Sequence, residues 1–227
     1  MSGRVLTALE LPIHQRNDEV TRASEHIDWL QQKYKNTSRQ LIDLTQVYEA
    51  MKTLQFAGES EASEYLSNVN LRSRLRAAQL YASANRKNAL VVGTGNKVED
   101  YGIGFFTKYG DGAVDLSPIG DLSKSEVYTL GRSLGISEKI LQARPTDGLH
   151  PNGATDEDQI GASYDELEWA LETYDTGKRS VNFTGRAAEV MKIYTDRHEA
   201  NAHKMSMPPV FHIFDATKSP AYYDVHQ

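Results

Sequence analysis

The sequence contains no cysteine among its 227 residues. This absence excludes disulfide bonds, thiolate zinc sites and a cysteine nucleophile, and it is compatible with a reducing compartment. No apolar run is long enough to cross a membrane, and the first residues, MSGRVLTALELP, lack the layout of a secretory signal. We therefore expect a cytoplasmic protein that has no membrane partner.

Positive charge is scarce relative to negative charge. The net charge is −6 and the pI is near 5.7, which argues against a general nucleic-acid-binding surface. A polyanionic ligand would therefore have to meet locally placed lysines and arginines. Apolar residues make up 39% of the chain and charged residues 25%, as in an ordinary globular protein. Together with the length, this predicts a single domain over residues 1–227.

Several short catalytic and nucleotide-binding motifs are also missing. No Gly-x-Ser-x-Gly elbow of a serine hydrolase and no Gly-Lys-Ser/Thr of a Walker loop occurs. A dinucleotide fingerprint would need a third glycine where Val98 stands. His198 and His203 frame the sequence HEANAH, but five helical residues turn the two rings to different faces, which disfavours zinc-protease chemistry.

The first half of the chain alternates between strand and helix patterns. Such alternation predicts an α/β protein with a parallel sheet and helices on both faces, whose strands end at one common edge. The expected strands cover 5–11, 39–44 and 90–92; the expected helices cover 17–35, a segment from 45 to about 54, and about 67–85, with a loop at 57–63.

In the second half, two capping boxes mark helix starts. Ser123 with Glu126 opens one helix, whose N-terminus is a candidate anion site, and Ser163 with Glu166 opens another. A further helix is expected at about 184–200. Between them, residues 144–160 are rich in Pro, Gly and Asp and predict an active-site loop, and residues 201–227 predict an irregular tail.

The stretch from Leu90 to Glu126 has the composition of a phosphate site. The apolar run Leu90-Val91-Val92 reads as a buried strand, and it ends at Gly93-Thr94-Gly95. Glycines let a ligand approach the backbone, carboxylates such as Glu99 suit a hard cation, and lysines neutralise phosphate. We therefore predict a magnesium nucleotide site here.

The same stretch carries a family resemblance. GTGNKVEDYGIGFFTKYGDGAVDLSPIGDLSKSEVYTLGRSLGI, followed by RPTDGL and TDEDQIGASYDELE, closely resembles the ammonia-dependent NAD synthetases over nearly the whole chain. The resemblance implies an adenine-nucleotide α-hydrolase-like fold and a homodimer. It also implies conversion of deamido-NAD, ATP and ammonia to NAD, AMP and pyrophosphate with Mg²⁺, through an adenylated intermediate.

The resemblance also implies roles for individual residues. The positions that match the family's ATP-binding residues are Thr94, Lys124 and Thr146, and the position that matches its magnesium ligand is Glu99. The positions that match its deamido-NAD-binding residues are Arg74, Lys108, Asp115, His203 and Lys204. No residue is assigned as a general acid or base, because positioning and charge neutralisation are expected to supply the catalysis.

One departure from the family pattern bears on activity. The phosphate-binding loop Ser-Gly-Gly-x-Asp-Ser does not occur, and neither do the strand and helix that carry it, so we expect an N-terminally shortened chain. A smaller departure is Ala113, which replaces a usual glycine and would be strained at a positive φ.

Three hypotheses follow from the resemblance and this departure. The first is that the chain is an NAD synthetase, whose ammonia would be free or come from a partner because no glutaminase segment occurs. Alternatively, it is a non-catalytic relative that retains dinucleotide binding. The third hypothesis is another ATP pyrophosphatase, such as an amidating enzyme similar to GMP synthetase.

Overall fold

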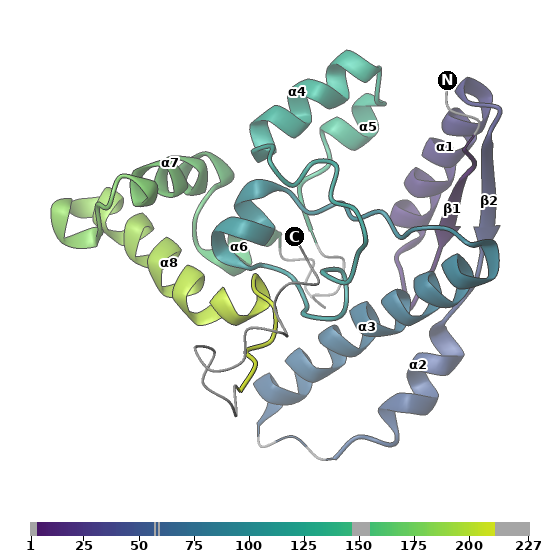
Figure 1. Cartoon of the computed structure of the whole chain (residues 1–227), viewed down its shortest axis with the longest axis horizontal. Helices are drawn as coiled ribbons and strands as arrows, with labels where there is room; N and C mark the ends of the chain where they lie inside the picture. Colours follow the sequence, from purple (N-terminus) through teal and green to yellow (C-terminus); the bar gives the residue numbers. More distant parts are fainter. Residues whose placement is uncertain (1–3, 57, 59, 147–154, 212–227) are drawn as a thin grey trace, which may run out of the picture.

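The computed structural model describes residues 4–56, 58, 60–146 and 155–211 (Figure 1). In chain order, the elements of this described part are β1 (Leu6–Glu10), α1 (Asn17–Lys33), β2 (Thr37–Leu41), α2 (Thr45–Lys52), α3 (Glu61–Lys87), η1 (Lys97–Ile103), α4 (Lys124–Leu134), α5 (Glu138–Leu141), α6 (Asp156–Ile160), α7 (Tyr164–Asp175), η2 (Ser180–Asn182), α8 (Gly185–Asn201) and η3 (Ala202–Lys204).

β1 and β2 form the predicted parallel pair. Their register runs from Leu6 opposite Thr37 to Glu10 opposite Leu41. α1 is the crossover between them and lies beside the pair in Figure 1. Arg39 of β2 donates to the buried carboxylate of Glu10 at 2.5 Å, so the charge that β1 buries is neutralised by its neighbouring strand.

The loops that follow the two strands meet at one edge, as expected for parallel strands. The N–H of Leu44 donates to the carbonyl of Pro12 at 3.0 Å. Ile13, Leu44 and Tyr48 are buried there and pack against leucines of α3. Arg76 of α3 donates to the carbonyl of Leu11 at 2.9 Å, which ties the long helix to the end of β1.

Two predicted boundaries in this half move. β2 covers Thr37–Leu41 rather than 39–44, and α3 begins at Glu61 rather than about 67. The early start has a local cause, because Ser60 accepts from the Ser63 N–H and Ser63 caps Ser60 in return. The predicted loop at 57–63 is therefore shorter at its C-terminal end.

The predicted buried strand at 90–92 is wrong. Val92 makes only an isolated parallel bridge with Leu116, and the N–H of Gly93 donates to the Leu116 carbonyl at 2.7 Å. Val91 is buried, but Leu90 is 61% and Val92 50% exposed. An extended segment that is paired over one bridge does not bury both of its faces, so the apolar run alone was misleading.

A second core holds the elements of the C-terminal half. Val98 and Ile103 of η1 pack there with Leu167 of α7 and with Met191 and Tyr194 of α8, all of them buried. Figure 1 shows α7 and α8, which contribute to this core, side by side. The predicted helices at both capping boxes and at 184–200 are confirmed as α4, α7 and α8.

The last five residues of the predicted loop at 144–160 are helical rather than irregular. Asp156–Ile160 form the short helix α6, which Thr155 caps. Residues 147–154 of this loop and residues 212–227 of the predicted tail lie outside the described residues. The described start of the tail contains the end of α8 and the turn η3. None of the described helices has the length and apolar character needed to cross a membrane.

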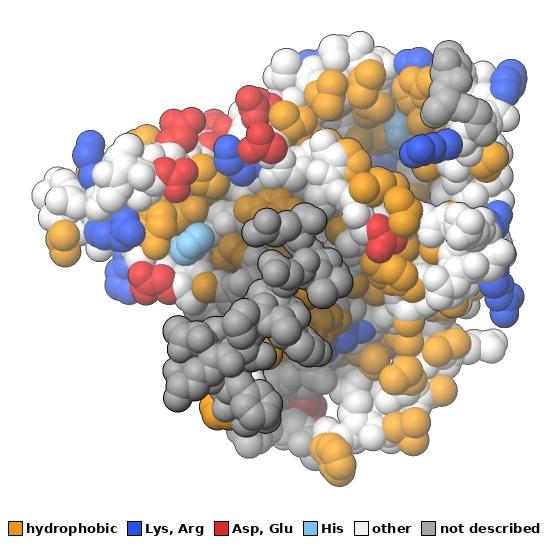
Figure 2. Space-filling view, viewed as in Figure 1, with side chains coloured by type: hydrophobic (Ala, Val, Ile, Leu, Met, Phe, Trp, Pro, Cys, Tyr) orange, Lys and Arg blue, Asp and Glu red, His pale blue; other side chains and the backbone are white. Residues whose placement is uncertain are grey.

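α2 and the segment that follows it present apolar side chains to solvent. Leu54 is 80% exposed and Phe56 fully exposed, and Val47, Met51 and Leu66 are each more than 40% exposed. We call these five residues the α2 patch. Figure 2 shows orange side chains over this lower part of the molecule. A contiguous exposed apolar patch is typical of an interaction surface.

We predict that Leu167→Ala lowers the free energy of unfolding by about 2–5 kcal/mol, because Leu167 has no exposed surface and its loss leaves a cavity in the second core. Urea denaturation measures this change. Leu90→Ala, at a mostly exposed leucine, is the matched control and should change stability by less than about 0.5 kcal/mol. Equal losses in the two variants would contradict the assignment of this core.

Candidate nucleotide and magnesium site

Glu99 lies in the first turn of η1, a seven-residue π-helix. π-helical turns are rare and are frequently found at functional sites. Asn96 starts this helix: its side-chain oxygen accepts from the N–H groups of Val98 and Glu99, both at 3.0 Å. The Asn96 amide nitrogen donates to Glu99 Oε2 at 2.5 Å. Asn96 thus fixes both the backbone and the carboxylate of Glu99.

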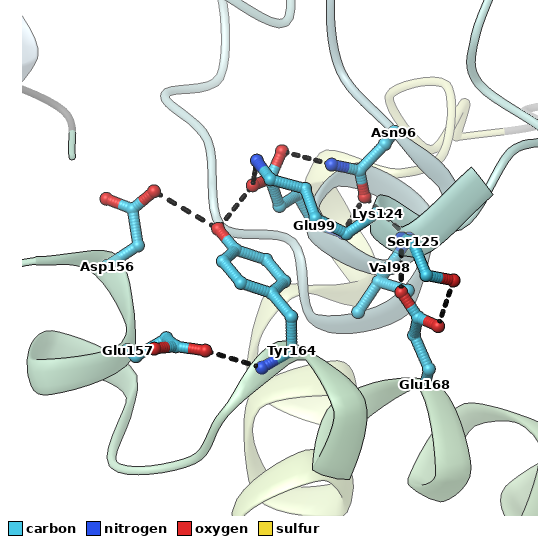
Figure 3. Close-up of polar contacts among 9 residues, drawn as sticks. All are labelled: Asn96, Val98, Glu99, Lys124, Ser125, Asp156, Glu157, Tyr164 and Glu168. Atoms are coloured by element: carbon cyan, nitrogen blue, oxygen red, sulfur yellow. Dashed lines mark hydrogen bonds and ion pairs between the residues drawn. The ribbon is translucent and has the colours of Figure 1, made fainter. Parts of the chain in front are cut away.

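Lys124 reaches the other carboxylate oxygen. Its Nζ lies 2.6 Å from Glu99 Oε1, and the two side chains are 19% and 15% exposed (Figure 3). Lys124 is the first residue of α4. Ser123 at the N-cap and Glu126 in the first turn form the predicted capping box. The structure therefore brings together the predicted magnesium ligand and one predicted ATP-binding residue. A short, mostly buried charge-assisted pair of this kind is a strong interaction.

Tyr164 completes this group from the first residue of α7. Its hydroxyl group donates to Glu99 Oε1 and lies 3.1 Å from Asp156 Oδ2 (Figure 3). Lys124 Nζ lies 4.6 Å from the centroid of its ring. Burial, together with the negative charges of Glu99 and Asp156, raises the pKa of the Tyr164 hydroxyl. The phenol therefore stays protonated and acts as a donor.

Sequence reasoning assigned no role to Asn96, Asp156 or Tyr164. An Asn directly before a helical segment is a capping signal that could have identified the first of them. Tyr164 and Glu99 are 65 residues apart, so their contact leaves no local signal.

The N-terminus of α4 is not an open anion site in this structure. The N–H of Ser125 donates to Glu168 at 2.8 Å, and the Ser125 hydroxyl donates to the other oxygen of the same carboxylate at 2.7 Å. Ser123 caps the N–H of Glu126. Protein groups therefore satisfy these donors, and the prediction of an anion site at the backbone N–H groups of this helix end is not supported.

Thr94 and Thr146, the other predicted ATP-binding residues, are both exposed. Thr94 lies in the Gly93-Thr94-Gly95 turn just before Asn96, and Thr146 is the last described residue before the gap at 147–154. Their assignment to ATP stays a prediction from the resemblance.

Four of the five predicted dinucleotide-binding residues gather between α3, the segment after η1, and η3. Arg74 Nε donates to the carbonyl of Lys108 at 3.3 Å, and Lys108 Nζ donates to the carbonyl of His203. Lys204 Nζ donates to the carbonyls of Gly104 and Phe106, both at 2.9 Å. Burial lowers the pKa of Lys204. Three cationic side chains thus line one region, which suits an anionic ligand.

Asp115, the fifth, is held elsewhere. Its Oδ2 accepts from the N–H of Val91 at 2.8 Å, and its Oδ1 accepts from the Tyr81 hydroxyl at 3.1 Å. The structure thus gives Asp115 a role in fixing the 90–92 segment against α3. Ala113, which departs from the family pattern, does not have a positive φ, so the expected backbone strain is absent there. In the same stretch Tyr109 has a positive φ, at 64°.

Among the described residues, no group of three or more His, Cys, Asp or Glu side chains could enclose a metal ion. Magnesium bound to a nucleotide needs only one or two protein carboxylates, because phosphate and water oxygens fill its other positions. Glu99, with Asp156 on the far side of a shared phenol, fits such a partial site. The geometry therefore suits a metal that arrives with a nucleotide.

Solved structures with the same architecture define the class of this fold. The chain matches the structure of NMN synthetase from Francisella tularensis with a TM-score of 0.75 and 32% identity, over 92% of this chain and 79% of the other. It matches the ammonia-dependent NAD synthetase from Campylobacter jejuni with a TM-score of 0.69 and 25% identity, over 91% and 77%. The fold is that of the pyridine-nucleotide synthetases, and the predicted α/β fold class is confirmed.

Sequence comparison identifies the family within this class. The profile described as NAD synthase matches residues 3–208. The ammonia-dependent NAD synthetase of Methanosarcina acetivorans is 40% identical over 186 residues, which are 81% of this chain and 69% of that protein. The chain belongs to the NAD synthase family, and the resemblance found in the sequence is confirmed.

We predict that Gly95→Ala destabilises the loop that presents Glu99. An added Cβ at Gly95 would lie 1.7 Å from Asp100 Oδ2. The Asp100 carboxyl group is already in an unfavourable environment, because burial and the charges of Asp111 and Glu99 raise its pKa to about 7. Overpacking of this kind costs about 1–3 kcal/mol in urea denaturation. The double variant Gly95→Ala with Asp100→Ala should regain most of the lost stability, because it removes the clashing carboxylate. A double variant that is no more stable than Gly95→Ala would show that the clash with Asp100 is not the cause.

Proposed function

We propose that this chain catalyses the ATP-dependent amidation of deamido-NAD with ammonia, which gives NAD, AMP and pyrophosphate. The observation that carries the proposal is the 40% identity to an ammonia-dependent NAD synthetase over 186 residues. In the proposed reaction the nicotinate carboxylate attacks the α-phosphorus of ATP and pyrophosphate leaves. Ammonia then attacks the acyl-adenylate carbonyl, and AMP leaves as the new C–N bond forms.

The proposed roles follow from the charges in the structure. Glu99 would hold Mg²⁺, which would neutralise charge that develops on the phosphates. Lys124 would contact a phosphate oxygen, because it is a mobile point charge that lies next to that carboxylate. Arg74, Lys108 and Lys204 would bind the pyrophosphate and carboxylate groups of deamido-NAD from the region between α3 and η3. Thr94 and Thr146 remain proposed contacts of ATP.

Purified chain supplied with ATP, Mg²⁺, ammonium and deamido-NAD should form NAD and AMP in equal amounts, measured by chromatography. We predict that Glu99→Gln and Lys124→Met each lower kcat/KM by roughly a hundredfold or more, because each removes charge stabilisation of the phosphates. Lys139→Met is the matched control, because it breaks the surface pair that Lys139 makes with Glu25. Wild-type rates in the Lys124 variant would contradict the assigned role.

Other products would favour the alternative functions. The similarity to the Francisella protein named NMN synthetase supports a second candidate, amidation of nicotinate mononucleotide, and a higher kcat/KM for that substrate would favour it. Binding of deamido-NAD without AMP formation would indicate a non-catalytic relative. AMP formation with xanthosine monophosphate, but not with deamido-NAD, as the substrate to be amidated would indicate an amidating enzyme similar to GMP synthetase.

The proposed homodimer has a candidate interface in the α2 patch. Lys52 lies in the last turn of α2, which carries part of this patch, and Glu61 and Glu64 lie in the first turn of α3. In a two-fold arrangement the patch would meet its own copy, and Lys52 of each protomer would face acidic residues of its partner. The patch thus has both the apolar centre and the self-complementary charges that an isologous interface needs.

We predict that Leu54→Ser combined with Phe56→Ser raises the dimer dissociation constant roughly tenfold or more, because both side chains are exposed in the protomer and would be buried in the dimer. Analytical ultracentrifugation measures the constant. Phe211→Ser is the control, since Phe211 is 89% exposed outside the patch. Equal dimerisation of all three proteins would exclude this face.

A further inference from the structure

Tyr164 contacts three charged side chains of the site at once. Its hydroxyl group donates to Glu99 and lies 3.1 Å from Asp156 Oδ2, while Lys124 Nζ lies over its ring. Each of the three comes from a different element: η1, α6 and α4. Figure 3 shows the phenol between the two carboxylates.

Glu99 and Lys124 form an ion pair in this structure. At 2.6 Å, each charge neutralises the other. For Lys124 to meet a phosphate and Glu99 to meet a divalent cation, this pair has to open. The opening removes from Glu99 the cation that pairs with its mostly buried carboxylate in this structure, so the remaining contacts decide where that carboxylate points.

The Glu99 oxygen atoms that each donor contacts are compatible with replacement of Lys124 by a metal ion. Lys124 and Tyr164 both contact Glu99 Oε1, whereas Asn96 donates to Oε2. A carboxylate oxygen has two lone pairs. When Lys124 leaves, one lone pair of Oε1 becomes free for a metal ion while Tyr164 still holds the other.

We propose that Tyr164 is a positioning residue of the metal-nucleotide site, which keeps the Glu99 carboxylate aimed while Lys124 transfers from Glu99 to phosphate. This inference rests on the proposed function, because it requires a divalent cation and a nucleotide at Glu99. Groups that orient a metal ligand through a hydrogen bond typically contribute tenfold to a hundredfold in metal affinity.

The surroundings of Tyr164 hold it rigidly enough for this role. The residue is 6% exposed, its N–H donates to Glu157 Oε1 at 2.9 Å, and Ser163 caps the helix that it begins. Asp156, itself buried, places its Oδ2 3.1 Å from the same hydroxyl oxygen. The phenol therefore cannot follow the Glu99 carboxylate if that carboxylate moves, and it defines a fixed point for it.

The test is Mn²⁺ binding to the full chain in the presence of ATP, followed by electron paramagnetic resonance of the free ion. Tyr164→Phe keeps the ring under Lys124 and removes only the hydroxyl group. We expect it to weaken Mn²⁺ binding about tenfold to a hundredfold. Tyr174→Phe, on the same helix and packed against Tyr194 and His198, is the control and should leave the Mn²⁺ affinity unchanged.

A double-mutant cycle separates positioning from a general structural effect. If Tyr164 acts through Glu99, Tyr164→Phe should have no further effect on Mn²⁺ binding in a Glu99→Gln background. Full additivity of the two changes would overturn the proposal, as would wild-type Mn²⁺ affinity in Tyr164→Phe. The cycle also covers a partial loss of stability in Tyr164→Phe, because such a loss would weaken Mn²⁺ binding in both backgrounds alike.

The readout also distinguishes this inference from the proposed function. A wild-type chain that binds Mn²⁺ with ATP but makes no NAD would contradict synthetase activity and leave the Tyr164 comparison fully measurable. A wild-type chain that binds no Mn²⁺ with ATP would overturn the metal-nucleotide site and the role of Tyr164 together.

Discussion

The placement of one carboxylate, that of Glu99, is the constraint on which the candidate site depends. Burial of a charge is costly unless it is paired and hydrogen-bonded, and Glu99 meets this requirement with donors from three directions. Those donors come from the cap of η1, the start of α4 and the start of α7. The hydrogen bonds of Glu99 thereby join η1 to α4 and α7, and the bonds between Ser125 and Glu168 join α4 to α7 as well.

The two helix starts show how capping and site geometry are linked. Ser123 and Ser163 cap the N-termini of α4 and α7. The next residues, Lys124 and Tyr164, are the first residues of these helices. A capped first turn has little freedom to fray, so these side chains leave from well-defined positions. Glu168 strengthens the arrangement, because it reaches from α7 to the first turn of α4.

Much of this could be predicted where the signal is local. Capping boxes and helical periodicity gave α4, α7 and α8, and a family motif gave Glu99 and Lys124, which the structure joins. The resemblance did not give Tyr164 or Asp156 a role, because their function depends on packing of distant segments. The strand at 90–92 was wrong for a related reason: an apolar run records burial, and burial of Leu90 requires neighbours that the run itself cannot specify.

The single bridge at Val92 explains what Asp115 does. Where a second strand would supply backbone partners, the Val91 N–H is bound by the Asp115 side chain, and the Val91 carbonyl accepts from the N–H groups of Asp115 and Leu116. Five residues after Val91, the Asn96 side chain accepts from the backbone N–H groups of Val98 and Glu99. The loop that carries Thr94 is therefore held at both ends by side chains as well as by the backbone bonds of Gly93 and Lys97. Its position depends on Asp115, which does not contact Glu99, and on Asn96, which contacts both the backbone and the carboxylate of Glu99.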